Sequence, residues 1–331
     1  MTEEEVKAYV RSLPPHIFGL QTYEHLSCAR LKKGLHHLNF KLVVSDTTKT
    51  CTAVVRLPAT AEDQEALTRE VWYLEKLKSD VTPNILFHAT ASSLGMPVLI
   101  TAFVPGAHIA FSRLTEAQIG MLAKKLTDVH SIKENRYSSA GAVLPTFMGT
   151  YRNYARAVVY EDIDKPYERA RSIPHDDKTV SRARTLLDRM LNSNNDSWGQ
   201  NEFSLCHGDI GIYNVLWTEH DLRLIDWDGA RFGDPADDIA YIFAINQVSS
   251  RWRSSFLNTY SRLSPTQHIQ SRIEIYLLKN YLFDVVWSMG KLLEEQENRS
   301  LVKLARGEYQ VMYEERLTAL KRYLIKTSRK S

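Results

Sequence analysis

The 331-residue chain has little cysteine: only Cys28, Cys51 and Cys206 occur, and they are far apart. No two of them form a CxxC pair, which argues against a disulfide framework and against a structural zinc site. An odd number of scattered cysteines is typical of a protein of the reducing cytosol. The composition therefore predicts a cytoplasmic protein.

Long apolar runs and an excess of one charge are lacking as well. No uninterrupted apolar stretch approaches the length of a membrane span, and the N-terminus MTEEEVKAYV is acidic where a signal peptide would be basic. The 42 basic and 39 acidic residues give a net charge of +3, and only the tail KRYLIKTSRKS is markedly basic. We therefore expect neither a nucleic-acid nor a membrane partner.

The first part of the chain alternates between short apolar segments and turns. Residues 2–11 have the pattern of a short amphipathic helix with Thr2 as its N-cap. From residue 24 the segments have the pattern of strands, interrupted by one helical pattern over residues 60–80. These features predict a small antiparallel-sheet lobe that spans residues 1–105.

The second part is mainly helical. Thr115 caps a clear amphipathic pattern, and further helical patterns cover residues 178–192 and the chain from Asp237 onward. Residues 133–175 are rich in Tyr and Arg, and we expect them to be irregular. The predicted fold class is therefore α+β, with a larger, mainly helical lobe over residues 106–331.

The segment FSLCHGDIGIYNVLW, residues 203–217, contains Asp209 and, five positions later, Asn214. After the turn TEHD, the strand pattern LRLID ends on a second carboxylate, Asp226. Because one arm of a hairpin begins where the other ends, we expect Asn214 and Asp226 to be neighbours in space. Carboxylate and amide oxygens suit Mg²⁺, which shares its coordination with substrate phosphates. The pattern predicts a magnesium site.

The interval between these residues is that of phosphoryl-transfer enzymes of the kinase type. In such enzymes the loop aspartate, here Asp209, accepts the proton of the attacking hydroxyl. The asparagine and the second aspartate, here Asn214 and Asp226, hold the metal against the nucleotide phosphates. We therefore expect ATP and Mg²⁺ as cofactors.

Two longer blocks, HGDIGIYN and IDWDGARFGDPADDIA, resemble the signature of the aminoglycoside phosphotransferase and choline kinase superfamily. They depart from it only at Ile239, where leucine is usual. The resemblance implies a bilobal protein-kinase-like fold and transfer of the ATP γ-phosphate to a hydroxyl of a small molecule. It also implies that His207 orients the catalytic loop and that a buried Asp238 ties this loop down.

The resemblance extends into the first part of the chain. VVRLP and TREVWYLEKL resemble the strand and helix that supply a phosphate-binding cation and its ion-pair glutamate, which implies Arg56 and Glu70. MPVLITAFVPG resembles the hinge that binds adenine, through the Ala102 carbonyl and the Val104 amide, with Thr101 behind them. KKGLHHLNFKL takes the place of the phosphate-covering loop, and we assign its histidines no catalytic role.

Protein kinases have an arginine before the catalytic aspartate, where this chain has Gly208, and there is no room here for an activation segment. A small-molecule acceptor is therefore expected: an aminoglycoside, or alternatively choline, ethanolamine, homoserine or a sugar. A non-catalytic pseudokinase is the remaining alternative. It would be expected to have lost the base or a metal ligand, whereas this chain has all three residues. We expect Asp284 and Trp287 to contact the acceptor, although helical spacing places many of the nearby aromatic residues in the core.

Overall fold

The computed structural model describes residues 1–31, 37–78, 80–138, 144–193, 198–199, 202–264, 268–297 and 307–328. The chain forms two compact units. The first comprises Met1–Ile109 and Tyr213–Asp228, and the second comprises Ala110–Ile212 and Gly229–Ser331. The hairpin after Tyr213 thus groups with the first unit, and the division of the chain at residues 105 and 106 stays a prediction.

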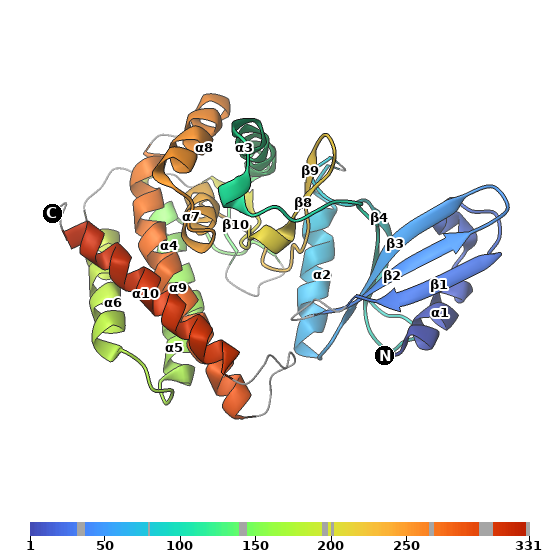
Figure 1. Cartoon of the computed structure of the whole chain (residues 1–331), viewed down its shortest axis with the longest axis horizontal. Coiled ribbons are helices and arrows are strands. Elements are labelled where there is room, and N and C mark those ends of the chain that lie inside the picture. Colours follow the sequence, from blue (N-terminus) through green and yellow to red (C-terminus); the bar gives the residue numbers. More distant parts are fainter. Residues whose placement is uncertain are drawn as a thin grey trace. The chain divides into compact units, whose positions relative to one another are not determined.

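The first unit is built on an antiparallel sheet of five strands in the order β1-β2-β3-β5-β4, of which β1 to β4 are labelled in Figure 1. The strands are β1 (His25–Arg30), β2 (His37–Ser45), β3 (Thr50–Pro58), β4 (Ile85–Ala89) and β5 (Val98–Ala102). The predicted antiparallel sheet with one helix inserted is confirmed. The predicted turn at Gly34 lies outside the described residues.

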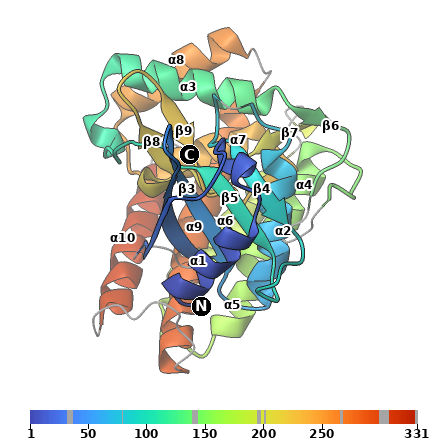
Figure 2. The same cartoon turned by 90° about the vertical axis from the view of Figure 1, so that its right-hand side faces the viewer.

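One face of this sheet carries the core of the first unit. Alternate residues of β3, Ala53, Val55 and Leu57, are buried with those of β1, β2 and β5. Helix α1 (Glu3–Ser12), which is labelled in Figure 2, and the 3-10 turn η1 (Pro15–Phe18) contribute residues to the same cluster. Because side chains alternate along a strand, Arg56 projects from the opposite face.

Helix α2 (Glu62–Leu74) contacts β3 and β5. The hairpin of β8 (Val215–Trp217) and β9 (Leu222–Leu224) pairs Val215 with Leu224 and Trp217 with Leu222. The backbone N–H of Leu224 also donates to the Val81 carbonyl at 2.8 Å, which joins the hairpin to the segment after α2. These bonds bring residues 213–228 to the first unit.

The second unit contains a small sheet of order β10-β7-β6 among helices. Its strands are β6 (Lys133–Glu134), β7 (Phe203–Cys206) and β10 (Arg231–Gly233). Its helices include α3 (Glu116–His130), α4 (Tyr151–Val159), α5 (Lys165–Ala170), α6 (Asp177–Asn192), α7 (Pro235–Ile245), α8 (Ser250–Leu263), α9 (Ile269–Gln296) and α10 (Glu308–Ser328), with short turns η2 (Phe111–Arg113) and η3 (Tyr160–Asp164).

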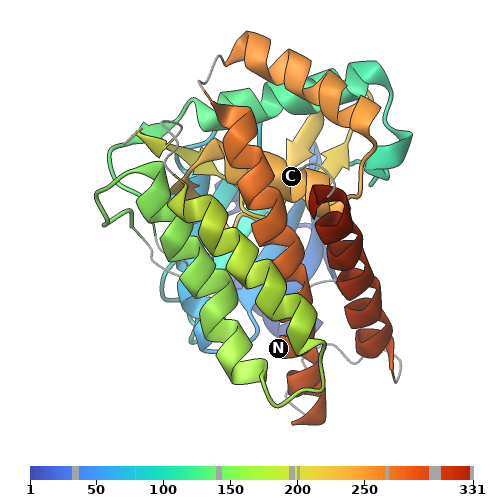
Figure 3. The same cartoon turned by 90° about the vertical axis from the view of Figure 1, so that its left-hand side faces the viewer.

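The long helix α9 lies at the centre of the second unit. It contacts α5, α6, α7 and α10, and Figure 3 shows the orange α9 between the yellow-green α6 and the red α10. Six consecutive residues, Ile275–Asn280, are buried, as expected of a helix that is covered on every side. The buried ion pair between Asp234 and Arg272, at 2.7 Å, joins the start of α7 to α9.

Within the region 133–175, which we expected to be irregular, residues 151–170 are helical, so that prediction is wrong for this part. Thr150 forms a capping box with Asn153, and α4 continues through the π-turn η3 into α5. The buried face of α4 includes Tyr151, Tyr154 and Val158 at helical spacing. Counting these tyrosines as apolar would have revealed the helix.

No helix in the described part of the chain combines the length and the apolar character needed to cross a bilayer. The two long helices α9 and α10 run side by side in the second unit (Figure 1).

Candidate functional site

The residues proposed as metal ligands lie beside each other in the first unit. Asn214 ends the short turn η5 (Ile212–Asn214), and its carbonyl accepts a hydrogen bond from the Ile225 N–H at 3.0 Å. Ile225 directly precedes Asp226, so Asn214 and Asp226 are neighbours across the hairpin. Strand β9 ends at Leu224, and Asp226 therefore follows the strand instead of ending it.

Asp226 has an unusual backbone conformation. Its φ of +67° lies in the left-handed region, which costs free energy for any residue with a Cβ and which aspartate tolerates better than most. Such strain is retained where the surroundings hold a residue in place, and it concentrates at functional sites. The backbone conformation thus marks Asp226 as a residue that the fold positions.

Arg56 connects Asp226 to helix α2. Its Nη1 forms an ion pair with Glu70 Oε1, and its Nη2 lies 2.6 Å from Asp226 Oδ1. The Glu70 side chain is 3% exposed and that of Asp226 35% exposed, so the guanidinium joins a buried carboxylate to an accessible one. Arg56 serves this bridging role well because its planar fork has two donor edges.

The charge of Arg56 is strongly stabilised. Burial alone would lower the pKa of its guanidinium, but the carboxylates of Asp226, Glu70 and Asp228 outweigh burial and raise this pKa. Arg56 therefore remains a cation on this face of the sheet at any physiological pH.

Helix α2 is joined to residues 226–228 by two further contacts. Glu70 Oε1 accepts the Trp227 N–H at 3.2 Å, and Arg69 donates to the Asp228 carbonyl from Nε at 3.2 Å and from Nη2 at 3.0 Å. Arg69 was not among the residues predicted from the sequence. Its position next to Glu70 in a helix, beside a predicted ion pair, was the available signal.

The residues predicted to bind adenine lie at the end of β5. Thr101 pairs with Val54 of β3, two positions before Arg56, so Thr101 and Arg56 share a face of the sheet. The Ala102 N–H donates to the Asn84 carbonyl at 2.8 Å. Val104 follows the strand and is half-buried. Adenine binding at these positions stays a prediction.

The donor set of the hairpin suits a hard divalent cation. Asn214 offers an amide oxygen and Asp226 a carboxylate, and neither side chain is fully buried. Oxygen donors of this kind match Mg²⁺, which keeps several waters and needs few protein ligands. The residues present therefore fit the predicted metal.

In the second unit, the loop that carries Asp209 is anchored by a buried carboxylate. Asp238 of α7 accepts the His207 N–H on Oδ2 and the Gly208 N–H on Oδ1, both at 2.7 Å. Burial would raise the pKa of Asp238, but the hydrogen bond from His130 and the bond from the Gly208 amide keep it below its usual value. Asp238 thus remains ionised, as an acceptor of backbone hydrogen bonds.

Gly208 is required by the shape of this loop. Its φ is +82°, and a Cβ at this position would lie 2.3 Å from the Gly229 carbonyl oxygen. No side chain fits at that distance from a backbone atom. The local backbone therefore requires glycine at the position where protein kinases have arginine.

A buried network behind the loop was not anticipated from the sequence. His130 of α3 donates from Nε2 to Asp238 Oδ2 at 3.2 Å, and its Nδ1 lies 2.8 Å from the Tyr260 hydroxyl. Cys206 lies close enough to join His130 and Asp238 as a possible metal-binding group. Because both nitrogens of His130 and both oxygens of Asp238 are hydrogen-bonded, this group is a support for the loop.

The proposed base, Asp209, is hydrogen-bonded to two side chains, one from its own loop and one from α7. Its N–H donates to His207 Nδ1 at 3.3 Å, and its Oδ1 accepts the Tyr241 hydroxyl at 2.6 Å. Asn246, at the end of α7, donates to the Ile210 carbonyl at 3.2 Å. His207 was among the residues predicted to support this loop, and Tyr241 was not.

Asp284, the predicted acceptor contact, already has a partner. Its Oδ1 forms an ion pair with Arg316 Nε of α10 at 3.0 Å, and Arg316 Nη1 donates to the Asp284 carbonyl at 3.4 Å. Burial raises the pKa of Asp284 to about 6; Arg316 opposes this rise and Asp209 adds to it. The ring of Trp287 lies under the same guanidinium, 4.4 Å away, and Lys291 Nζ lies 5.5 Å from it.

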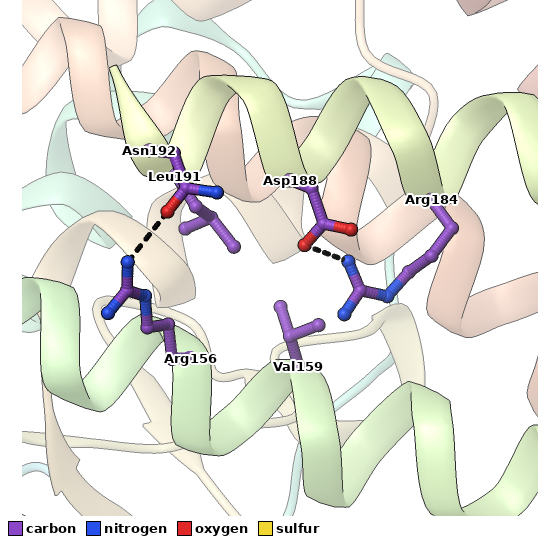
Figure 4. A pocket seen from close by; sticks show the side chains of 6 residues that line it. All are labelled: Arg156, Val159, Arg184, Asp188, Leu191 and Asn192. Atoms are coloured by element: carbon purple, nitrogen blue, oxygen red, sulfur yellow. Dashed lines mark hydrogen bonds and ion pairs between the residues drawn. The ribbon is translucent and has the colours of Figure 1, made fainter.

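Two pockets lie away from these residues. One, of about 390 Å³, lies between α4 and α6 of the second unit, where Arg156 bonds Asn192 and Arg184 bonds Asp188 (Figure 4). The other, of about 320 Å³, is lined by residues of α2 and β4 and of the segment between them. None of the predicted site residues lines either pocket.

Comparison with solved structures shows the fold. A choline/ethanolamine kinase family protein from Mesorhizobium loti is 17% identical, with a TM-score of 0.67 over 98% of this chain and 95% of that one. Choline kinase from Cryptosporidium parvum Iowa II is 14% identical, with a TM-score of 0.69 over 99% and 97%. A thermostable mutant of the aminoglycoside phosphotransferase APH(4)-Ia, in complex with AMP-PNP and hygromycin B, is 16% identical, with a TM-score of 0.60 over 95% and 98%.

These similarities confirm the predicted α+β, protein-kinase-like fold. Residues 27–269 also match the family described as "Phosphotransferase enzyme family". This match covers most of the chain and confirms both the predicted superfamily and the predicted class of enzyme. The chain belongs to the phosphotransferase enzyme family.

Proposed function

We propose that this protein is a small-molecule kinase that transfers the γ-phosphate of ATP to a hydroxyl group and uses Mg²⁺. The observation that carries the proposal is the bridge from Glu70 through Arg56 to Asp226, because it holds a cation beside a strained, accessible carboxylate. That combination suits binding of a nucleotide phosphate with its metal.

Each residue has a distinct role in the proposed reaction. Bound Mg²⁺ would neutralise charge on the phosphates, and Asn214 and Asp226 would hold it. Arg56, oriented by Glu70, would contact the phosphates with a fixed positive charge. Thr101, Ala102 and Val104 would bind the adenine ring. Asp209 would orient the acceptor hydroxyl and accept its proton.

The acceptor is proposed to be an amine-bearing compound of the aminoglycoside type. Asp284 would contact its ammonium group. The negative charge of Asp209 acts on Asp284, so a cation in addition to Arg316 would stabilise the Asp284 carboxylate. Trp287 already contacts Arg316 and Lys291, which disfavours a quaternary ammonium on the same ring. This observation favours a primary amine over choline as the acceptor.

The test is ADP release from ATP and Mg²⁺ across a panel of aminoglycosides, choline, ethanolamine, homoserine and free sugars. We expect one amine-bearing acceptor to raise turnover in the wild type, and Asp226→Asn to lower it by a factor of about 10² or more. Asn keeps the tolerance for a left-handed backbone, so this variant separates metal binding from strain. A flat panel without nucleotide binding would refute the proposal.

Glu161→Gln serves as the matched control. This carboxylate pairs with Lys165 at 3.5 Å, outside the residues assigned to the reaction. Its turnover is expected to equal that of the wild type. Equal losses in Glu161→Gln and Asp226→Asn would show that the assay reports a general effect of removing an acidic charge.

A further inference from the structure

Helix α7 contacts the loop of Asp209 at three levels. Asp238 accepts the N–H groups of His207 and Gly208, Tyr241 donates to the carboxylate of Asp209, and Asn246 donates to the carbonyl of Ile210. Tyr241 follows Asp238 by three positions, so both side chains leave the helix on one face. A single helix face therefore supports the backbone of the loop and also the carboxylate that the loop presents.

The bond from Tyr241 to Asp209 has the geometry of a strong hydrogen bond. An O···O distance of 2.6 Å is typical of a hydroxyl that donates to a carboxylate. Burial and the neighbouring charge of Asp209 raise the pKa of the Tyr241 phenol well above its usual value. The hydroxyl therefore keeps its proton and remains a donor across the working range of an enzyme.

We propose that Tyr241 is a positioning residue, which fixes the orientation of the Asp209 carboxylate toward the acceptor hydroxyl. This inference rests on the proposed function, since it requires Asp209 to be the base. An aspartate carboxylate rotates readily about its Cβ–Cγ bond, and a donor held by a packed helix restricts that rotation. A base held in one orientation loses less entropy on reaching the reactive geometry.

The substitution Tyr241→Phe separates an effect on orientation from an effect on folding, because it keeps the ring and removes only the donor. Loss of one hydrogen bond to a charged group costs about 1.5–3 kcal/mol, so we expect kcat to fall by roughly ten- to a hundredfold. The KM values for ATP and for the acceptor should change less than threefold, because Tyr241 acts only through Asp209.

The matched control is Tyr323→Phe, which removes a hydroxyl that donates to the Glu274 carbonyl at 3.1 Å in the same unit. Thermal melts of both variants report any structural loss. The decisive measurement is the double variant Tyr241→Phe/Asp209→Asn. If Tyr241 acts through Asp209, the second substitution should lower the rate of Asp209→Asn by less than twofold.

ADP release would be measured with the best acceptor of the panel and also without an added acceptor, when water takes the phosphoryl group. A full-sized loss from Tyr241→Phe in the Asp209→Asn background, or no loss in the wild-type background, would overturn the inference. If Asp209→Asn itself kept the wild-type rate, the proposed base would be wrong. Failure of the role inferred for Tyr241 and failure of the proposed function are therefore distinguishable.

Discussion

The two units hold their proposed catalytic carboxylates in different ways. In the first unit, Asp226 has a strained backbone and is bound by the side chain of Arg56. In the second unit, Asp209 lies on a loop whose backbone amides are bound by buried Asp238, and its carboxylate accepts a neutral hydroxyl. The first arrangement depends on the balance of charges, and the second depends on hydrogen-bond geometry.

This difference follows from what each group is proposed to do. The negative charge of a metal ligand is balanced by the bound metal. Before the metal binds, the arginine beside Asp226 stabilises the charge of this carboxylate. A base must accept a proton, and a full positive charge beside it would weaken its basicity. A neutral hydroxyl orients Asp209 without adding such a charge. The comparison predicts that substitutions in the two units fail for different reasons.

The largest effect is expected for Asp238→Ala. This change leaves the buried His207 N–H, the partly buried Gly208 N–H and His130 without their acceptor, which should cost about 4 kcal/mol of unfolding free energy and abolish turnover. Denaturant unfolding measures the first effect and ADP release the second. The exposed carboxylate of Asp188 provides the control, and Asp188→Ala should cost less than about 1 kcal/mol. A comparable loss in both variants would contradict the role of the loop network.

A smaller loss is expected for Arg56→Met. Removing the guanidinium leaves Glu70 buried without its cation, but the partly exposed Asp226 can be solvated, so the cost should be about 3 kcal/mol. Arg56→Lys keeps the charge and should recover about half of this free energy. Denaturant unfolding of the three proteins would show it. If Arg56→Lys were as unstable as Arg56→Met, geometry and not charge would hold Asp226. The proposed difference between the two units would then disappear.

The smallest effect concerns Asp284 and pH. The folded pKa is raised to about 6 from 3.8, so the folded state binds this proton more tightly than the unfolded chain. The associated stabilisation is present below about pH 4 and is lost as the pH rises toward 6. We expect Asp284→Asn to gain roughly 1–2 kcal/mol relative to the wild type between these pH values, because part of the side chain remains exposed.

Paired thermal melts at pH 4 and pH 7 measure this change. Asp164→Asn, which breaks a pair with Arg184 in the same unit, is the control. A pH-independent difference between Asp284→Asn and the wild type would mean that Arg316 fully compensates for the burial of Asp284. Asp284 would then be held by a balance of charges, as Asp226 is in the first unit.

The sequence predicted what depends on local pattern. The helix after Thr2, the helix after Thr115 and the hairpin around residues 218–221 follow from caps, spacing and a turn, and the structure has them. Asn214 and Asp226 could be paired because a hairpin fixes which residues meet. The family signature supplied Asp238 and His207, whose hydrogen bonds the structure then resolves.

What the sequence did not reveal are contacts between residues distant along the chain. Tyr241 reads as one more apolar position of a buried helix, and His130 as the end of another, because spacing shows which face is buried but not which atom it meets. The ion pair between Asp284 and Arg316 joins two helices across 32 positions. Such pairs depend on the packing of whole helices, which no local pattern encodes.

The hydrogen bonds of Asp238 also have a consequence for motion. Loop amides usually exchange with solvent quickly, because they open without disturbing the core. Opening the amides of His207 and Gly208 leaves the buried carboxylate of Asp238 without two of its hydrogen-bond donors, which carries a large free-energy cost. They should therefore exchange as slowly as the amides of α7, so that the segment that presents the reactive aspartate is, in its dynamics, part of the core.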